Sequence, residues 1–156
     1  VKPHMKKHDI QTFTTGILMI TKHNFPYGIK IVSEKPKLPD VYMDAEQMKQ
    51  VMVNLLNNAK DATAGRSSPR VEIRLSSDDR YVYVKVADNG CGISKKDLSR
   101  ISTPFYTTKK EGMGIGLAIS RSIIKKHGGD LSIESKVNKG SVFTISIPVE
   151  KRSVKR

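Results

Sequence analysis

Apolar positions repeat with two different periods along the chain, and the changes of period predict its helices and strands. Helical spacing of the apolar residues is found at residues 9–22, 44–64, 95–100 and 115–126. Alternating apolar and polar residues, as in half-buried strands, are found at residues 29–33, 41–43, 71–76, 81–87, 130–135 and 141–147. We therefore expect one domain in which both helices and strands contribute to the core.

The predicted helix at residues 44–64 has three faces instead of the usual two. Placed at the helical angle, one face is apolar and a second carries charged side chains. The third face lies beside the apolar one and consists of Gln50, Asn54, Asn57, Asn58 and Asp61. A polar stripe next to the core indicates a polar ligand, whereas two asparagines alone would also fit ordinary helix-surface polarity.

A glycine turn follows the predicted strand at residues 81–87, with the sequence Asp-Asn-Gly-Cys-Gly at residues 88–92. The Asp88 carboxylate can accept a hydrogen bond from the exocyclic amine of adenine, and Gly90 and Gly92 let the backbone approach the base. Guanine has a carbonyl at the matching position, so this site would favour ATP over GTP. A turn without a ligand is the alternative, because Asp-Asn-Gly turns are common.

Glycines recur before the helical pattern at residues 115–126. Gly112, Gly114 and Gly116 precede helix N–H groups that can hold phosphates. Their spacing is neither that of a dinucleotide fingerprint nor that of a P-loop. The segment before them is rich in Thr, Lys and Gly, and it is expected to be a mobile lid that contacts phosphates when it closes. A flexible hinge is the alternative.

Length and composition limit the setting of the chain. Its 156 residues suffice for a single domain, which we expect to span residues 1–156 with a core at about 29–149. The sequence contains no run apolar enough for a membrane span or a secretion signal, and its single cysteine cannot form an internal disulfide. A cytoplasmic location is expected, whether or not a parent protein is anchored to a membrane.

The formal net charge of +13 is the strongest departure from average composition. Charge alone would suit a nucleic acid, an anionic lipid, a nucleotide or an acidic protein. Much of the excess lies near the ends, at Lys2, Lys6 and Lys7 and in residues 151–156, where solvated or disordered ends are expected. Because no recognised nucleic-acid motif accompanies the charge, we expect no nucleic-acid partner.

The polar stripe, the turn at residues 88–92 and the glycines at 112–116 occur in an order that resembles the ATP-binding catalytic domain of sensor histidine kinases. Residues 103–109, Thr-Pro-Phe-Tyr-Thr-Thr-Lys, resemble the phenylalanine box of that family. The wording of residues 109–117 is most similar to kinases of the nitrogen-regulation and oxygen-sensing type. The family shares a superfamily with gyrase, mismatch-repair ATPases and a heat-shock chaperone. This resemblance implies an α/β (α+β) two-layer sandwich, with a mixed, mostly antiparallel sheet of about five strands and three main helices on one face.

The resemblance also implies ATP and Mg²⁺ as cofactors. Asn54 would be catalytic and would bind the metal through its amide oxygen, which is a hard ligand without charge. Asn58, one turn later, would meet phosphate or metal-bound water. The other residues expected to bind ATP are Asp61, Asp88, Gly90, Gly92, Ile93, Thr107, Thr108, Lys109, Gly112, Gly114, Gly116 and Leu117.

Gln50 discriminates between activities within the superfamily. It stands one turn before Asn54, where the hydrolysing members carry a glutamate that activates water, and an amide cannot be that base. As a catalytic position, Gln50 therefore favours phosphotransfer over a gyrase-type ATPase. Glutamine is also simply a good helix former, which is the alternative explanation.

An acceptor histidine and a sensor domain are expected to lie outside this chain. His8 precedes Asp9 in the manner of an acceptor histidine, but too few residues separate it from Asn54 to build a second hairpin helix. His127 ends a helix, where a histidine favours the helix dipole. We expect a monomeric domain that donates the γ-phosphate of ATP to a histidine on a separate dimerisation domain, with a response regulator as an indirect partner. A nucleotide-binding regulatory module without transfer is the alternative.

Overall fold

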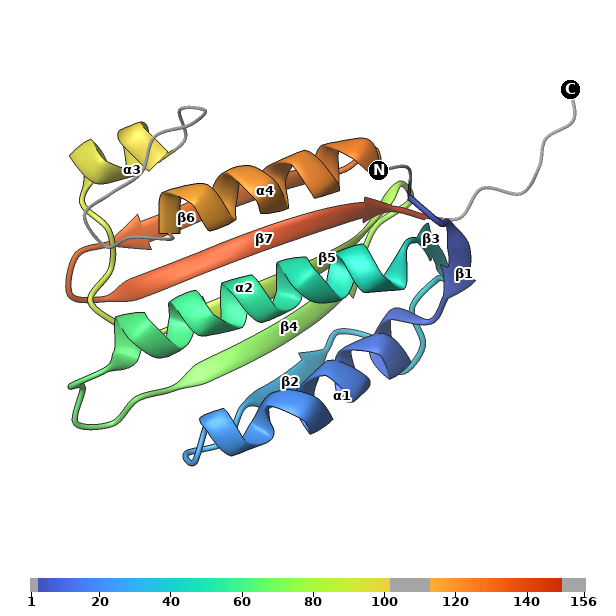
Figure 1. Ribbon diagram of the computed structural model, residues 1–156. Coiled ribbons are helices and arrows are strands. Elements are labelled where there is room, and N and C mark those ends of the chain that lie inside the picture. The colour runs from blue at the N-terminus through green and yellow to red at the C-terminus, as the bar shows by residue number, and fades with distance from the viewer. Residues whose placement is uncertain (1–2, 102–112, 150–156) are drawn as a thin grey trace, which may run out of the picture.

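The computed structural model describes residues 3–101 and 113–149, which form two layers (Figure 1). The helices are α1 (Ile10–Thr21), α2 (Ala45–Thr63), α3 (Lys95–Ile101) and α4 (Met113–Lys126), and a 3-10 turn, η1 (Lys22–Asn24), follows α1. The strands are β1 (Lys6–His8), β2 (Lys30–Ser33), β3 (Val41–Met43), β4 (Val71–Ser77), β5 (Tyr81–Asp88), β6 (Asp130–Lys136) and β7 (Gly140–Pro148). Every predicted element is present, and β1 is an additional strand that the pattern did not predict.

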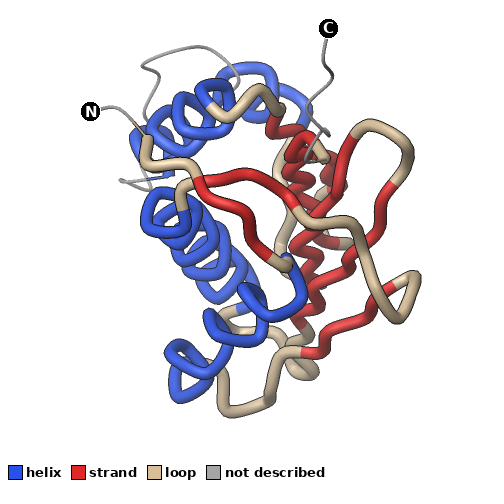
Figure 2. The backbone as a smooth tube through the Cα atoms, turned by 90° about the vertical axis from the view of Figure 1, so that its right-hand side faces the viewer, coloured by secondary structure: helices blue, strands red, loops and turns tan. Residues whose placement is uncertain are grey.

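Five strands form one sheet in the order β2-β4-β5-β7-β6. β2 runs parallel to β4, and all other neighbours in this sheet are antiparallel. Alternate side chains of the central strands are buried under the helices: Ile73, Leu75, Val82, Val84, Val86, Phe143, Ile145 and Ile147. α1, α2 and α4 cover this face, and the end-on view separates the helix layer from the strand layer (Figure 2). The predicted two-layer sandwich is confirmed.

α2 is the central helix, and its limits follow from local chemistry. The Asp44 carboxylate caps the helix by accepting the N–H of Gln47 at 3.0 Å. The helix ends at Thr63, because Ala64 is extended and Gly65 has a φ of +87°, which favours glycine. Its core face consists of Met48, Val51, Met52, Leu55, Leu56 and Ala59, each at most 2 % exposed. Burying side chains of the size of leucine contributes roughly 1.5–3 kcal/mol each, so packing fixes the rotation of α2 about its axis.

A buried junction holds the start of α2 against the end of α4. The Asp44 N–H donates to Nε2 of His127 at 3.0 Å, and Nδ1 of the same ring lies 2.8 Å from the Ile123 carbonyl. His127 directly follows the last residue of α4, as the sequence predicted, and its buried ring bridges α4 and the start of α2 by hydrogen bonds.

The N-terminal segment is also part of this junction. β1 pairs antiparallel with β3, and the His4 N–H donates to the Asp44 carboxylate at 2.7 Å. Of the two expectations for Lys6 and Lys7, a disordered end is wrong, because their backbone lies in this two-stranded sheet. The solvated alternative agrees with their exposed side chains, which are usual for lysines on short outer strands.

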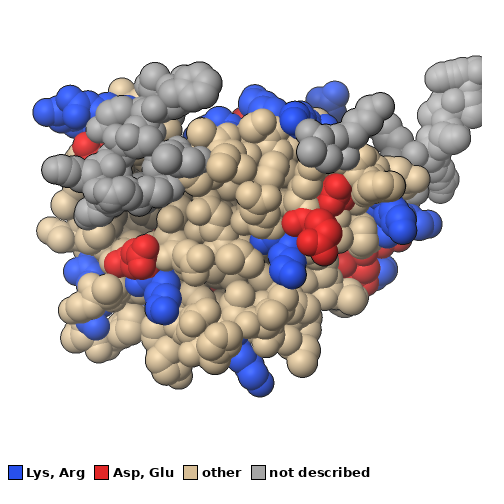
Figure 3. All heavy atoms as spheres, in the orientation of Figure 1, with Lys and Arg blue, Asp and Glu red and all other residues tan. Residues whose placement is uncertain are grey.

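The surface of the helix layer is mostly uncharged, and Lys and Arg side chains of its described residues lie in several separate places around it (Figure 3). None of the helices in residues 3–101 and 113–149 is long and apolar enough to cross a membrane.

Candidate functional site

The polar stripe of α2 is divided between solvent and the interior. Gln50, Asn57 and Asp61 are exposed, whereas Asn54 and Asn58 are half-buried. The Asn54 Nδ2 group donates to the hydroxyl of Ser120 on α4 at 3.2 Å. The Asn58 Nδ2 group is buried and meets no hydrogen-bond acceptor within the described part of the chain. A buried donor without an acceptor costs about 1–3 kcal/mol, which makes Asn58 a candidate ligand-binding residue.

Asp88 is the last residue of β5, at the place where the sequence predicted it. Its Oδ1 accepts the N–H of Gly90 at 2.8 Å. Burial raises the pKa of Asp88 above its usual range, while the backbone N–H groups of Gly90 and Ser141 and the charge of Arg66 act in the opposite direction. A partly desolvated carboxylate at a strand end is energetically unfavourable and is typical of functional sites. Asp88 therefore needs a donor that a ligand could supply.

The two glycines of the turn are required by close backbone contacts. A Cβ at Gly90 would overlap the carbonyl of Ala62 on α2, and a Cβ at Gly92 would overlap the carbonyl of Lys136 on β6. Gly92 also has a φ of +75°, which side chains rarely adopt. The Cys91 N–H donates to the Ala62 carbonyl at 2.9 Å. The turn is thus docked directly on the last turns of α2, beside the polar stripe.

Arg66 holds this turn in place, and the sequence analysis missed it. Its Nε donates to the Asn89 carbonyl at 2.9 Å, and its Nη2 donates to the carbonyls of Gly90 at 2.6 Å and Asn138 at 2.7 Å. One guanidinium therefore ties the turn to the β6–β7 loop and to the chain after α2. An arginine after a helix end belongs to no motif, so the sequence carried no signal for this role.

α4 begins earlier than predicted, which changes the role of its glycines. Gly114 and Gly116 lie inside α4, so the prediction that they precede the helix is wrong. A Cβ at Gly116 would stand 2.5 Å from Oδ1 of Asn54. Glycine in a helix costs roughly 1 kcal/mol relative to alanine, and here that cost allows α4 to pack against Asn54. Ser120, the second residue of α4 that contacts Asn54, was not predicted, because a serine in a helix gives no signal in the sequence.

The remaining predicted site residues are distributed as follows. Thr107, Thr108, Lys109 and Gly112 lie outside the described residues. Leu117 is 1 % exposed and belongs to the core, and Ile93 is half-buried with its N–H donating to the Ser135 hydroxyl at 2.7 Å. The structure therefore places Leu117 as a packing residue of α4.

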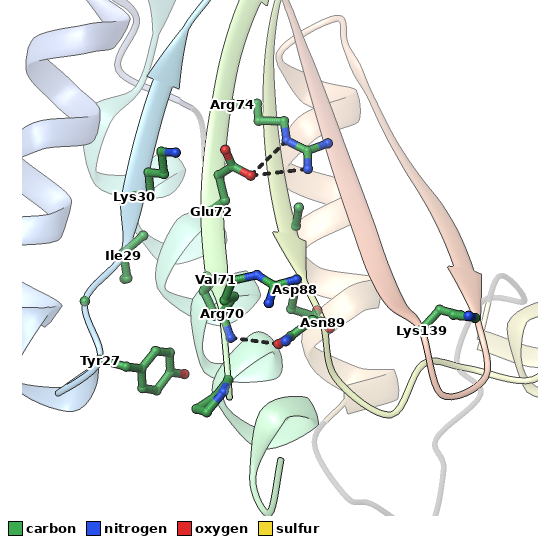
Figure 4. Close-up of a pocket in the computed structure, with 13 residues that line it drawn as sticks. Tyr27, Ile29, Lys30, Arg70, Val71, Glu72, Arg74, Asp88, Asn89 and Lys139 are labelled. Carbon is green, nitrogen blue, oxygen red and sulfur yellow. Dashed lines mark hydrogen bonds and ion pairs between the residues drawn. The ribbon is translucent and has the colours of Figure 1, made fainter. Parts of the chain in front are cut away.

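A separate hollow of about 610 Å³ opens on the face of the sheet that the helices leave uncovered (Figure 4). Its lining includes Tyr27, Lys30, Arg70, Glu72, Asp88 and Lys139. Arg74 at its upper end is neutralised by Glu72, with a nitrogen–oxygen distance of 3.3 Å. The hollow shares Asp88 with the predicted site but includes none of the α2 asparagines, so it is a different place from the polar stripe.

The predicted motifs meet along α2. The turn at residues 88–92 contacts Ala62, and α4 contacts Asn54, eight residues or about 12 Å earlier on the helix. The Asp88 carboxylate, an acceptor, lies at one end of this span. The amide oxygen of Asn54 and the unsatisfied amide N–H of Asn58 lie toward the other end. These residues fit an elongated ligand with a donor at one end and anionic, metal-binding groups at the other. Mg-ATP has this chemistry.

Residues 43–151 match the family of histidine kinase-, DNA gyrase B-, and HSP90-like ATPases. The match covers more than half of the chain, and the chain belongs to this family. The resemblance inferred from the order of the motifs is thereby confirmed.

The relatives include proteins named as sensor histidine kinases and a sporulation kinase. The chain is 33 % identical to the sensor histidine kinase ZraS of Klebsiella oxytoca, over 96 % of this chain and 33 % of that protein. It is 37 % identical to sporulation kinase E of Bacillus subtilis, over 76 % of this chain and 16 % of that protein. The chain thus spans a third or less of the length of these two relatives.

Solved structures agree with the fold. The nucleotide-free catalytic domain of histidine kinase ThkA superposes with a TM-score of 0.79 at 29 % identity, over 94 % of this chain and 98 % of that one. The same kinase, solved in complex with the response regulator protein TrrA, gives a TM-score of 0.78 at 25 % identity, over 94 % of this chain and 42 % of that one.

Proposed function

We propose that this chain is the ATP-binding catalytic domain of a histidine kinase, which binds Mg-ATP and passes its γ-phosphoryl group to a histidine on a separate domain. The observation that carries the proposal is the arrangement along α2, where Asp88 is a partly desolvated carboxylate and the buried Nδ2 group of Asn58 has no acceptor within the described residues. Membership of the ATPase family and the sensor kinases among the relatives support it.

The adenine end of the site is Asp88. Its carboxylate accepts the exocyclic amine of adenine, and that hydrogen bond offsets part of the cost of burying the carboxylate. Arg66 keeps the turn rigid, so the acceptor is positioned before the ligand arrives. Guanine presents a carbonyl at the same place and would leave two acceptors facing each other, so the site selects ATP.

The phosphate end of the site is formed by Asn54 and Asn58. Asn54 offers its Oδ1 as a ligand for Mg²⁺, which when bound supplies positive charge that offsets the charge of the triphosphate. Asn58 donates its Nδ2–H to a phosphate oxygen or to a water. The lid expected between residues 101 and 113, with Thr107, Thr108 and Lys109, would complete this end.

In the transfer step, an imidazole nitrogen of the acceptor histidine attacks the γ-phosphorus. A P–N bond forms, the bond between the γ-phosphorus and the bridging oxygen breaks, and ADP leaves with that electron pair. The attacking imidazole then loses a proton to solvent. Gln50 is exposed and carries an amide, so it does not deprotonate water, and hydrolysis lacks a base at that position.

The wider assignments follow from the same reading. The chain is a single domain that acts on a dimerisation domain with the acceptor histidine, and a response regulator then takes the phosphoryl group from that histidine. The isolated domain is a monomer that binds ATP in the cytoplasm, and it has no nucleic-acid partner. Relatives that are three or more times longer than the matched segment support the separate-domain arrangement.

The test is a transfer assay with ATP labelled at the γ-phosphate. The domain is mixed with the dimerisation hairpin of its parent kinase, and acid-labile, base-stable label on the hairpin histidine is expected within minutes. Asn54→Ala should abolish the labelling. Steady phosphate release that does not need the hairpin would indicate a gyrase-type ATPase instead, and ATP binding without labelling would indicate a regulatory module.

A further inference from the structure

We propose that Ser120 is a positioning residue that turns the Asn54 amide so that its oxygen, and not its nitrogen, faces the metal. This inference rests on the proposed role of Asn54 as the Mg²⁺ ligand. A primary amide presents an acceptor and a donor that differ little in shape. Metal binding requires the acceptor, so some contact must fix which end of the amide points into the site.

Ser120 is placed to fix the orientation of this amide. It is 2 % exposed, deep in the contact between α4 and α2, where a hydroxyl needs a hydrogen-bond partner. Its oxygen accepts the Nδ2–H of Asn54 at 3.2 Å across 66 residues of sequence. The donor end of the amide is thereby used, and Oδ1 keeps its lone pairs for a ligand.

Asn58 shows what happens to a neighbouring amide without such a partner. It lies one turn after Asn54 on the same stripe, and its buried Nδ2 meets no acceptor within the described residues. The two side chains therefore present opposite groups to the site. Asn54 presents an acceptor, as a metal requires, and Asn58 presents a donor, as a phosphate oxygen requires.

Gly116 makes the contact between α4 and Asn54 possible. It stands one turn before Ser120 on the same face of α4, and a Cβ there would lie 2.5 Å from Oδ1 of Asn54. α4 therefore contacts both ends of the amide, with the Gly116 backbone close to Oδ1 and a hydroxyl beside Nδ2. Some residues do not bind a metal themselves but fix the orientation of a side chain that does. Replacing such a residue commonly lowers the metal affinity by about 10–100-fold.

Two readouts test the role of Ser120. The first is the calorimetric affinity for ATP with Mg²⁺ and with EDTA, whose ratio measures the contribution of the metal. Ser120→Ala should lower this ratio about tenfold and leave the affinity in EDTA unchanged, and Ser120→Thr, which keeps the hydroxyl, should restore most of it. The second is the NMR signal of the Asn54 side-chain amide without nucleotide, whose hydrogens should exchange faster in Ser120→Ala.

Ser122→Ala is the matched control, because Ser122 is exposed on the same helix and its replacement should change neither readout. Ser120→Cys, whose thiol is only a weak hydrogen-bond acceptor, replaces Ser120→Ala if the latter does not fold. A folded Ser120→Ala domain, or Ser120→Cys in its place, with the wild-type Mg²⁺ ratio overturns the inference, and so does an unchanged Asn54 amide signal in that variant. If Asn54→Ala keeps the full Mg²⁺ ratio while the amide signal still depends on Ser120, the metal role of Asn54 fails although the contact is real.

Discussion

Asp44 and Asp88 stand near opposite ends of α2, and the same side chain is treated in opposite ways. The Asp44 carboxylate accepts N–H groups of His4 and Gln47, and these hydrogen bonds hold its pKa below the usual range. Burial raises the pKa of Asp88, and the hydrogen bonds that it accepts do not compensate for the lost hydration. The Asp44 carboxylate therefore stabilises the folded state, whereas burial of the Asp88 carboxylate destabilises it.

The surroundings of the two residues differ in the same sense. At the Asp44 end, the Asp44 carboxylate, its N–H and the His127 ring are paired, and the Oε1 atom of Gln47 is buried without a partner within the described residues. At the other end, the Asn58 Nδ2 group is unsatisfied and glycines bring backbones into close contact. The two ends therefore differ in the carboxylates themselves: hydrogen bonds outweigh burial at Asp44, and burial outweighs hydrogen bonds at Asp88.

The largest effect on nucleotide affinity is expected from a substitution of Asp88. Asp88→Asn should lower the affinity for Mg-ATP by about 100-fold, because the amide places a donor or a poorer acceptor against the adenine amine. Calorimetric titration measures the change. The same substitution at the other aspartate, Asp44→Asn, should change the affinity severalfold at most. Similar losses in both variants would mean that Asp88 acts through stability and does not bind the base.

The next effect concerns the contact of α4 with the metal ligand. Gly116→Ala should weaken Mg-ATP binding about tenfold, since the new Cβ displaces the Asn54 side chain. Gly16→Ala in α1 is the control, because no atom lies within 4 Å of a Cβ at that position. That control should raise the free energy of unfolding by about 0.5–1 kcal/mol. Unchanged Mg-ATP binding in Gly116→Ala would contradict the close contact.

A smaller effect is expected at the stabilising aspartate. Asp44→Ala should lower the free energy of unfolding by about 1 kcal/mol at pH 7, the usual value of a lost N-cap. Because the pKa of Asp44 is lowered in the folded state, its contribution is present above the unfolded value of 3.8 and is lost as the pH falls through the folded pKa. Urea denaturation at several pH values measures both. Asp79→Ala, in an exposed turn, should have no such effect.

The sequence predicted the elements well because their signals are local. Apolar spacing located α2 to within a residue at either end, and Asp44 and Gly65 marked its limits. The stripe with Asn54 and Asn58 was visible for the same reason, since a helical angle places residues without any knowledge of the rest of the fold. β1 was missed because its three residues carry no alternation of their own and are held by pairing with β3.

The contacts that shape the site were not predictable in this way. Ser120 meets Asn54 across 66 residues, Arg66 meets Asn138 across 72 and His127 meets Asp44 across 83. Serine in a helix, arginine after one and histidine at its end each have an ordinary local explanation. Their roles follow from the tertiary packing of α4 and the β6–β7 loop on α2, which no spacing rule describes.

The smallest effect is also the one that most directly sharpens the comparison of the two aspartates. Asp88→Asn should raise the thermal stability of the nucleotide-free domain at pH 7, because it removes a carboxylate whose charged form is disfavoured by burial. The pKa of Asp88 is raised in the folded state, so the unfolded chain ionises first and the wild-type domain loses stability as the pH rises from 3.8 through the folded pKa.

The gain of Asp88→Asn over the wild type should therefore shrink as the pH falls toward and below 3.8, because Asp88 becomes protonated in both the folded and the unfolded state. Thermal unfolding from pH 7 to below this value measures the trend, with Asp79→Asn as the exposed control. The slope is opposite in sign to the contribution of Asp44, which fades on acidification. A wild-type domain that is more stable than Asp88→Asn at pH 7 would show that Gly90 and Ser141 satisfy the carboxylate, and the two ends of α2 would then not differ in kind.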